Sequence, residues 1–206
     1  APGDINFFGS VLSSGEVLLE SEKSMDFRGT ESKIEGKTTL KAKNRLSLSG
    51  FLLALSSVFL TADELSVRPQ TQIESAADVL IDTKNPLAIP ADSSVLAKEL
   101  AIKSPNLTNK GLLQGSNSVD LNADRQLMNE GQILSEGNLT IETAQLQNNG
   151  ILQAALGNFT IADVSNAGGI WIAGPWTFLG DKAVNTGWLR VDGPWTGKFN
   201  TFENLD

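Results

Sequence analysis

The chain has 206 residues, and its 16 lysines and arginines against 24 aspartates and glutamates give a formal net charge of −8. Such an acidic chain is a poor candidate for binding nucleic acid, because the phosphate backbone requires a basic surface. Cysteine, histidine and tyrosine are absent, which excludes disulfides, thiolate metal sites and the Ser-His-Asp triad. We therefore expect no catalytic residue, no metal site and no cofactor.

Short strands are predicted along the whole chain from pairs of mostly apolar residues two positions apart. This spacing places both side chains of a pair on one face of a strand, and helical spacing is not sustained anywhere. The pairs recur about every 20 residues. In chain order they are Val17/Leu19, Thr38/Leu40, Val58/Leu60, Val79/Ile81, Leu100/Ile102, Val119/Leu121, Leu139/Ile141, Phe159/Ile161 and Trp176/Phe178, with a tenth beginning at Trp195.

Two further apolar rows follow the same period. One comes five to seven residues after most pairs, at Met25, Leu46, Leu65, Leu87, Leu107, Leu127 and Leu146. The other precedes the pairs in the C-terminal half, at Leu113, Ile133, Leu152, Ile170 and Leu189. A strand of about five residues cannot bury its apolar face alone, whereas stacked units bury a continuous core. The pattern predicts an all-β fold, a parallel β-helix of about ten coils of roughly 20 residues and ~48 Å in length.

Corners between strands are predicted from an Asn-x-Gly motif whose glycines are 20, 19, 18 and 19 residues apart. Both residue types tolerate the positive φ that tight corners require, and stacked asparagines can hydrogen-bond from coil to coil. We assign a structural role to Asn109, Asn129, Asn149, Asn166 and Asn185 and to Gly111, Gly131, Gly150, Gly168 and Gly187.

The organisation is predicted to be one continuous β-helix over residues 1–206, with a change of repeat near residue 107. Residues 1–107 form irregular coils, and residues 108–206 carry the Asn-x-Gly repeats. The longest irregular segment, residues 83–98, is a secondary candidate for recognition. We interpret the chain as a piece of a longer protein, expect the last coil to fray beyond Thr196, and expect exposed strand edges at both ends to favour self-association.

A cluster of tryptophans in the last 36 residues is the main candidate site. Trp176 and Trp195 share the row position of Leu139 and Phe159, so they are predicted to point inward.

Trp171 and Arg190 each lie three residues after a motif glycine and alternate with apolar positions, so they are predicted to face outward and stack in a cation–π pair. Trp188 is also predicted to face outward. Because Trp and Arg are enriched in binding hot spots, we predict receptor contacts at Trp171, Trp188 and Arg190; the alternative is that a loop or a further part of the protein covers them.

A catalytic alternative would need carboxylates gathered in a groove, as in polysaccharide-active β-helix enzymes. The candidates, Asp78, Asp82, Asp120, Asp124 and Glu136, are spread along the coils. We interpret them as solvated surface charges. A tailspike-like shaft is a further alternative, and it would require trimerisation.

Residues 129–148, Asn-Glu-Gly-Gln-Ile-Leu-Ser-Glu-Gly-Asn-Leu-Thr-Ile-Glu-Thr-Ala-Gln-Leu-Gln-Asn, resemble the haemagglutinin repeat of filamentous haemagglutinin-type exoproteins. These include adhesins and contact-dependent growth inhibition effectors of Gram-negative bacteria. The resemblance is clear over about 108–195, where the Gly-Pro-Trp-Thr copies depart from the usual pattern. It implies a right-handed β-helix, repeats without catalytic residues, and export through an outer-membrane two-partner secretion transporter.

From this resemblance we expect a non-catalytic segment of a secreted filament at the surface of a Gram-negative bacterium. Its expected role is adhesion or receptor recognition on a target cell, with a protein or glycan receptor on a bacterial or host cell as partner. No nucleic acid or cofactor is expected. The alternatives are a purely structural shaft and, less favoured, a polysaccharide-active enzyme.

Overall fold

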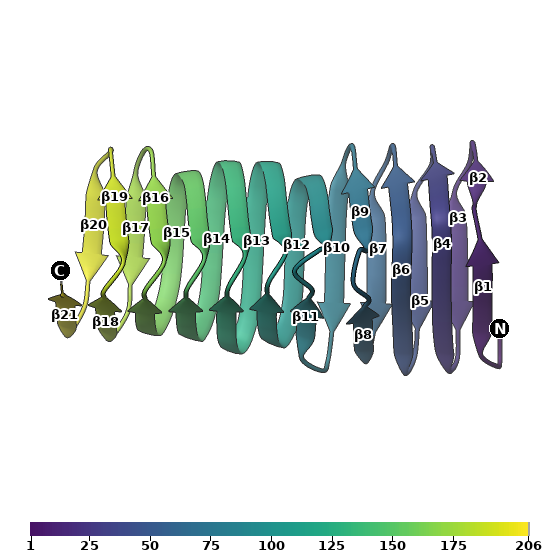
Figure 1. Ribbon diagram of the computed structural model, residues 1–206, viewed down its shortest axis with the longest axis horizontal. Helices are drawn as coiled ribbons and strands as arrows, with labels where there is room; N and C mark the ends of the chain where they lie inside the picture. The colour runs from purple at the N-terminus through teal and green to yellow at the C-terminus, as the bar shows by residue number, and fades with distance from the viewer. Residues whose placement is uncertain (206) are drawn as a thin grey trace.

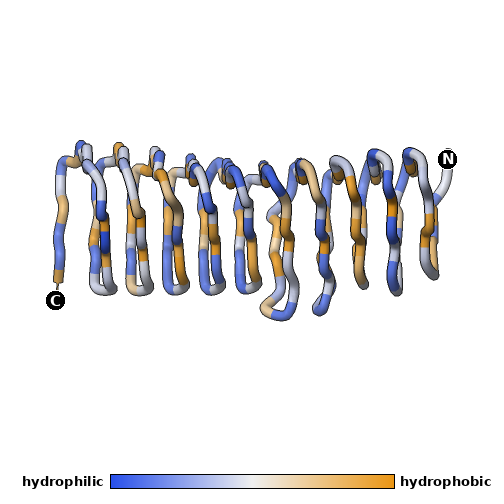
Figure 2. Tube along the Cα trace, turned by 90° about the horizontal axis from the view of Figure 1, so that it is seen from above, coloured by the Kyte–Doolittle hydropathy of each residue, from blue (hydrophilic) through white to orange (hydrophobic). Residues whose placement is uncertain are grey.

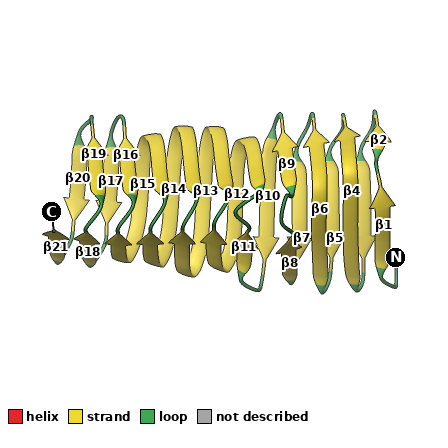
Figure 3. Cartoon of the chain, viewed as in Figure 1, coloured by secondary structure: helices red, strands yellow, loops and turns green. Residues whose placement is uncertain are grey.

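A computed structural model of the protein describes residues 1–205, in which the backbone winds along a straight rod with the chain termini at opposite ends (Figure 1). Strands and short loops make up this part of the chain (Figure 3). No helix occurs among residues 1–205, so this part of the chain contains no helix that is long and apolar enough to cross a membrane. The predicted all-β parallel β-helix of about ten coils is confirmed.

The described residues form 21 strands, and the longest lie in the middle of the rod, where single strands bend through the corners. They are β1 (Ile5–Gly9), β2 (Leu12–Ser13), β3 (Val17–Ser21), β4 (Ser24–Ile34), β5 (Thr38–Ala42), β6 (Arg45–Ala54), β7 (Val58–Ala62), β8 (Glu64–Val67), β9 (Gln72–Ser75), β10 (Asp78–Thr83), β11 (Leu87–Ile89), β12 (Ser94–Asn109), β13 (Leu112–Asn129), β14 (Gln132–Asn148), β15 (Ile151–Asn166), β16 (Gly169–Ile172), β17 (Trp176–Leu179), β18 (Lys182–Asn185), β19 (Trp188–Val191), β20 (Trp195–Lys198) and β21 (Thr201–Asn204).

Each coil contributes one strand segment to each of three faces, and the pairings between coils are parallel. The first face contains β1, β8, β11, β18 and β21. The second face contains β2, β9, β16 and β19. The third face contains β3, β5, β7, β10, β17 and β20. The longer strands β4, β6 and β12 to β15 pass from one face to the next.

The core is a stack of inward side chains from all three faces, one layer per coil. Hydrophobic residues recur from coil to coil along the rod (Figure 2). The predicted leucine row lies on the first face, where Met25 pairs with Leu46 and Leu46 with Leu65. The predicted row from Leu113 to Leu189 lies on the second face, and it extends back through Val95, Ile73 and Leu52. Both predicted rows are confirmed, since period-2 alternation fixes which side chains enter the core.

One predicted strand is displaced by two residues. Leu139 pairs with Gly157 and not with Phe159, which instead pairs with Ile141 and Phe178. Gly157 in turn pairs with Trp176, and a Cβ on Gly157 would lie 2.4 Å from Cδ1 of that tryptophan. The glycine therefore provides the volume that the indole of Trp176, 1% exposed, occupies in the core. Trp176 shares the row of Leu139, as predicted, but not that of Phe159.

The corner glycines are required for close stacking of the backbone on the neighbouring coil. They are not required for a positive φ, so the reason predicted from the sequence is wrong. Among residues 1–205, positive φ occurs only at Gly9, Gly50 and Gln70. A Cβ on Gly131 would lie 2.2 Å from the carbonyl oxygen of Gly111, and a Cβ on Gly150 would lie 2.0 Å from that of Gly131. Successive corners thus stack backbone on backbone, which leaves no room for a side chain.

The asparagines of the motif form a buried ladder next to these glycines. The side-chain amide of Asn109 donates to Oδ1 of Asn129 at 2.9 Å, and Asn129 donates to Asn148 at 2.8 Å. Asn148 donates to Asn166 at 2.6 Å, and the ladder continues through Asn185 and Asn204. The ladder passes through buried Asn148, whereas Asn149, assigned to it from the sequence, is exposed. The strand alternation decides this, because Asn148 follows Leu146 on the inward side.

Two segments expected to be irregular are ordinary parts of the rod. Residues 83–98 contain β11 and the start of β12, both paired with neighbouring coils, so the expected excursion is not present. The chain does not fray after Thr196. β21 reaches Asn204, which accepts a hydrogen bond from Asn185, and Phe202 packs against Trp195.

Candidate interaction surface

Trp171 and Arg190 form the predicted stack on the second face. They occupy the same position in β16 and β19, the last two coils of that face. Cζ of Arg190 lies 5.4 Å from the ring centroid of Trp171. A guanidinium over an indole is the favourable geometry of a cation–π contact.

Asp192 holds this pair together, and the sequence did not indicate it. Its Oδ1 accepts the Nε–H of Arg190 at 2.7 Å, and its Oδ2 accepts the indole Nε1–H of Trp171 at 3.0 Å. These two hydrogen bonds, that from Arg190 first, lower the pKa of Asp192 below its ordinary value. A Trp-x₂₀-Asp pairing only becomes visible once the register of consecutive coils is known.

The charge of Asp192 is expected to control the Trp171 environment at acidic pH. Because its folded pKa lies below the ordinary value of 3.8, the contact is fully present above that pH and is lost as the pH falls through the lower folded value. We expect the fluorescence of Trp171, obtained as the difference between the parent and Trp171→Phe, to titrate with a midpoint below 3.8. Asp192→Asn should remove this transition; its persistence would show that another group controls Trp171.

Trp188 faces outward as predicted, with 51% of its surface exposed. It pairs with Gly169 of the preceding coil, where a Cβ would lie 2.1 Å from Cζ2 of the indole. The indole therefore lies over the glycine, with its other side toward solvent. The three predicted residues share the second face of the last two coils, so the structure brings them onto one surface.

Trp171 and Arg190 are the end of a longer row that runs along the outside of the second face, one residue per coil. Register pairs connect its members, which alternate strictly between a large apolar and a long polar side chain. This alternating row is Leu12, Lys33, Leu53, Glu74, Leu96, Gln114, Leu134, Gln153, Trp171 and Arg190. Sequence reasoning missed it because the spacing between members varies from coil to coil.

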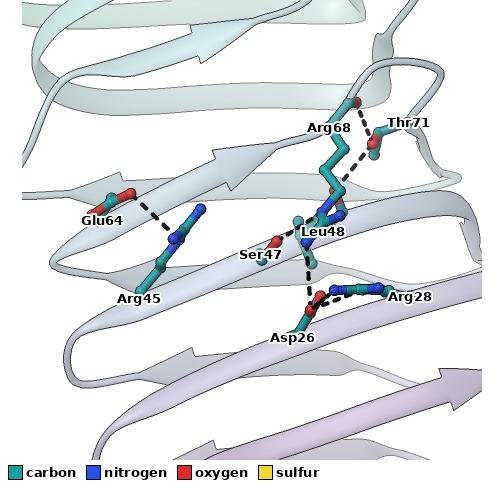
Figure 4. Close-up of polar contacts among 8 residues, drawn as sticks. All are labelled: Asp26, Arg28, Arg45, Ser47, Leu48, Glu64, Arg68 and Thr71. Carbon is teal, nitrogen blue, oxygen red and sulfur yellow. Dashed lines mark hydrogen bonds and ion pairs between the residues drawn. The ribbon is translucent and has the colours of Figure 1, made fainter.

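A second polar cluster lies on the first face near the N-terminal end (Figure 4). It lines a hollow of about 320 Å³. Asp26 accepts the Nε–H of Arg28 at 2.8 Å and an Nη–H of Arg68, two coils away, at 3.5 Å. Arg68 also donates to Ser47 of the intervening coil, and Arg45 pairs with Glu64. The hydrogen bond from Arg28 lowers the pKa of Asp26 against the opposing effect of burial. Arg28 and Arg68 share the carboxylate of Asp26, so these contacts link three coils.

The carboxylates considered for catalysis are distributed along the third face and its corners. Asp82 lies in register with Lys103. Asp78 and Glu99 lie in register on adjacent coils, a pair that the sequence did not indicate, and they accept hydrogen bonds from Ser57 and Asn117. Within residues 1–205 no group of three or more carboxylates is arranged to hold a metal ion.

These features define the class of the molecule, a β-solenoid repeat protein whose candidate site is an outer face and not a cleft. The chain belongs to the haemagglutinin repeat family, whose model matches residues 55–114 and 106–170, more than half of its length. The resemblance drawn from residues 129–148 is thereby confirmed. The match also reaches well into the region before residue 107, where only the period had been recognised.

The curated relatives are very large proteins. The chain is 26% identical over 148 residues to the "Protein adenylyltransferase and cysteine protease IbpA" of Histophilus somni (strain 2336), an alignment that covers 66% of this chain and 4% of that protein. It is 36% identical over 90 residues to "Toxin CdiA" of Escherichia coli, covering 43% of this chain and 3% of the toxin. It is 29% identical over 168 residues to "Deoxyribonuclease CdiA" of Dickeya dadantii (strain 3937), covering 78% of this chain and 5% of that protein.

The chain thus corresponds to a few per cent of the length of these relatives. No solved structure matches it.

Proposed function

We propose that the chain is a non-catalytic segment of a secreted filament at the surface of a Gram-negative bacterium, and that its second face takes part in adhesion or receptor recognition on a target cell. The observation that carries this proposal is the outward group of Trp171, Arg190 and Trp188 on a rigid rod. Clamped aromatic and guanidinium groups lose little conformational entropy on binding, a property of binding hot spots.

The rod geometry supports a role in presentation. Parallel coils stacked on buried Asn and apolar ladders form a stiff body that projects a surface away from the cell. The haemagglutinin repeats, shared with toxins of the CdiA type, support the assignment to a large exoprotein. The partners in this proposal are a protein or glycan receptor on a bacterial or host cell and an outer-membrane transporter of the two-partner secretion type.

The second candidate function is a purely structural shaft, which the Asn and Gly ladders along the C-terminal half favour. In that case the receptor-binding and enzymatic regions of the filament lie elsewhere in the whole protein. A polysaccharide-active site has weaker support, because Asp78 and Glu99 lie on an exposed sheet and not in a groove.

Binding of the labelled chain to bacterial and animal cells tests recognition. We expect saturable binding to one cell class, and we expect a double variant with Trp171→Ala and Trp188→Ala to weaken it at least tenfold, because hot-spot residues contribute about 2 kcal/mol or more each. The matched control is Leu18→Ala, an exposed apolar change on the third face, which should bind as the parent does.

Equal binding by the parent and the Trp variant would reject this patch. Absence of saturable binding to either cell class, with a β-rich circular dichroism spectrum, would favour the shaft.

A further inference from the structure

The alternating row is complementary to itself. Large apolar side chains stand at every second coil, and long hydrogen-bonding side chains stand at the coils between them. Coils are separated by the strand spacing of ~4.8 Å, so each kind recurs every ~9.6 Å along the rod. A strictly alternating row keeps the same pattern when it is read from the opposite end, so a second copy can match it in either direction.

The same face carries a neighbouring outward row that adds apolar surface. Register pairs connect its members, among which Phe51, Leu112, Ile151 and Trp188 are apolar and are separated by Gln72 and Ser94, by Gln132 and by Gly169. Ile151 is 37% exposed and Trp188 51%. Half-buried and exposed apolar side chains therefore recur along the second face with polar residues between them, and apolar side chains at the surface mark a candidate interaction site.

A partner that matches ten coils must keep the same period over the whole rod. A second copy of this chain does so by construction, because its coils have the same spacing. A ligand with a different repeat would lose register with the row after a few contacts. The period thus favours a second copy over other occupants of this face.

The charges of the alternating row select the orientation of the two rods. In a parallel pair each residue would face its own copy, so Lys33 and Glu74 would each meet a like charge, which is unfavourable in an interface. In an antiparallel pair centred on Leu96, Glu74 faces Gln114 and Lys33 faces Gln153. The apolar residues also meet each other, since Leu53 then faces Leu134 and Leu12 faces Trp171.

The next antiparallel register is less favourable. Centring the pair on Gln114 places a polar residue on the axis, leaves Leu12 without an apolar partner, and sets Lys33 against Arg190, which already pairs with Asp192. We propose that two copies of this segment associate antiparallel through the second face, with Leu96 on the two-fold axis. The biological role of this contact rests on the proposed function. Filaments on one cell point the same way, so an antiparallel contact joins filaments that project from two facing cells.

Sedimentation of the purified chain tests the association. We expect a concentration-dependent dimer, and we expect Leu96→Glu to raise its dissociation constant at least tenfold, because it places two carboxylates across the axis. Thr140→Glu is the matched control, a half-buried outward position on the third face two coils away, and it should dimerise as the parent does. Circular dichroism verifies that both variants fold. A strict monomer, or equal dimers from both variants, would overturn the proposal.

Intermolecular distances test the orientation. The chain has no cysteine, so single cysteines at positions 114 and 153 can carry spin labels for pulsed electron paramagnetic resonance. In the antiparallel pair the two labels are offset along the rod by two coils, about 10 Å, at position 114 and by six coils, about 29 Å, at position 153. Equal distances at both positions would show a parallel pair and overturn the proposal. Cell binding is measured separately, so failure of the dimer and failure of recognition are distinguishable.

Discussion

Replacing Asn148 by alanine is expected to lower the free energy of unfolding by about 3 kcal/mol, because it leaves buried partners without hydrogen bonds. Asn148 accepts from Asn129 at 2.8 Å and donates to Oδ1 of Asn166 at 2.6 Å and to the carbonyl of Gly169 at 3.1 Å. After the substitution, Oδ1 of Asn166 and an N–H of Asn129 lose these partners inside the rod. Chemical denaturation followed by circular dichroism measures the effect.

Asn149→Ala is the matched control, one residue away and of the same chemistry. Its side chain is exposed, so the change is expected to stay within about 0.5 kcal/mol of the parent. If both variants lose the same stability, the ladder does not hold the coils together. The comparison also decides between the two asparagines that precede Gly150, which composition alone does not separate.

Trp176→Leu is expected to destabilise the rod by about 3 kcal/mol through the cavity it leaves, and Gly157→Ala by about 2 kcal/mol through overpacking. The Cβ of alanine would lie 2.4 Å from Cδ1 of Trp176 and 3.2 Å from Cδ1 of Ile172. The double variant should lose less than the sum by about 1 to 2 kcal/mol, because the methyl group enters space that the indole vacates. This row accepts leucine, as Leu139 shows two coils before Trp176.

The control for this double-mutant cycle is Gly157→Ala combined with Leu113→Ala, a core position on another face and two coils away. These effects should add within about 0.5 kcal/mol, since the two sites share no contact. Additive behaviour of Gly157→Ala with Trp176→Leu would contradict the complementary volumes inferred from the structure.

Much of the fold follows from local features of the sequence. The rows through Met25 and Leu113 have the period of a stacked strand, and each side chain lies where alternation places it. The outward stack of Trp171 and Arg190 follows from the same alternation counted from two motif glycines. The direction of each side chain needs only one strand, and the register of Trp171 with Arg190 follows from the motif glycines that precede both residues by three positions.

The candidate site was predicted only in part. Asp192, which clamps Trp171 and Arg190, was missed because its contact to Trp171 crosses coils. The alternating row was missed for the same reason: Leu96 pairs with Glu74 in one neighbouring coil and Gln114 in the other, at unequal distances in sequence. A mean period of about 20 residues cannot identify partners whose separation changes with the length of each corner.

The amino-acid sequence by itself determined the repeat, the all-β solenoid and the inward or outward direction of nearly every side chain, because these depend on short-range alternation. Tertiary structure decided the register, as at Gly157, where the volume of Trp176 shifts the pairing by two residues. It also decided that the corner glycines serve close stacking of backbone on backbone. The physical reason is that neighbouring coils choose their alignment by packing volume and buried hydrogen bonds, which no single strand contains.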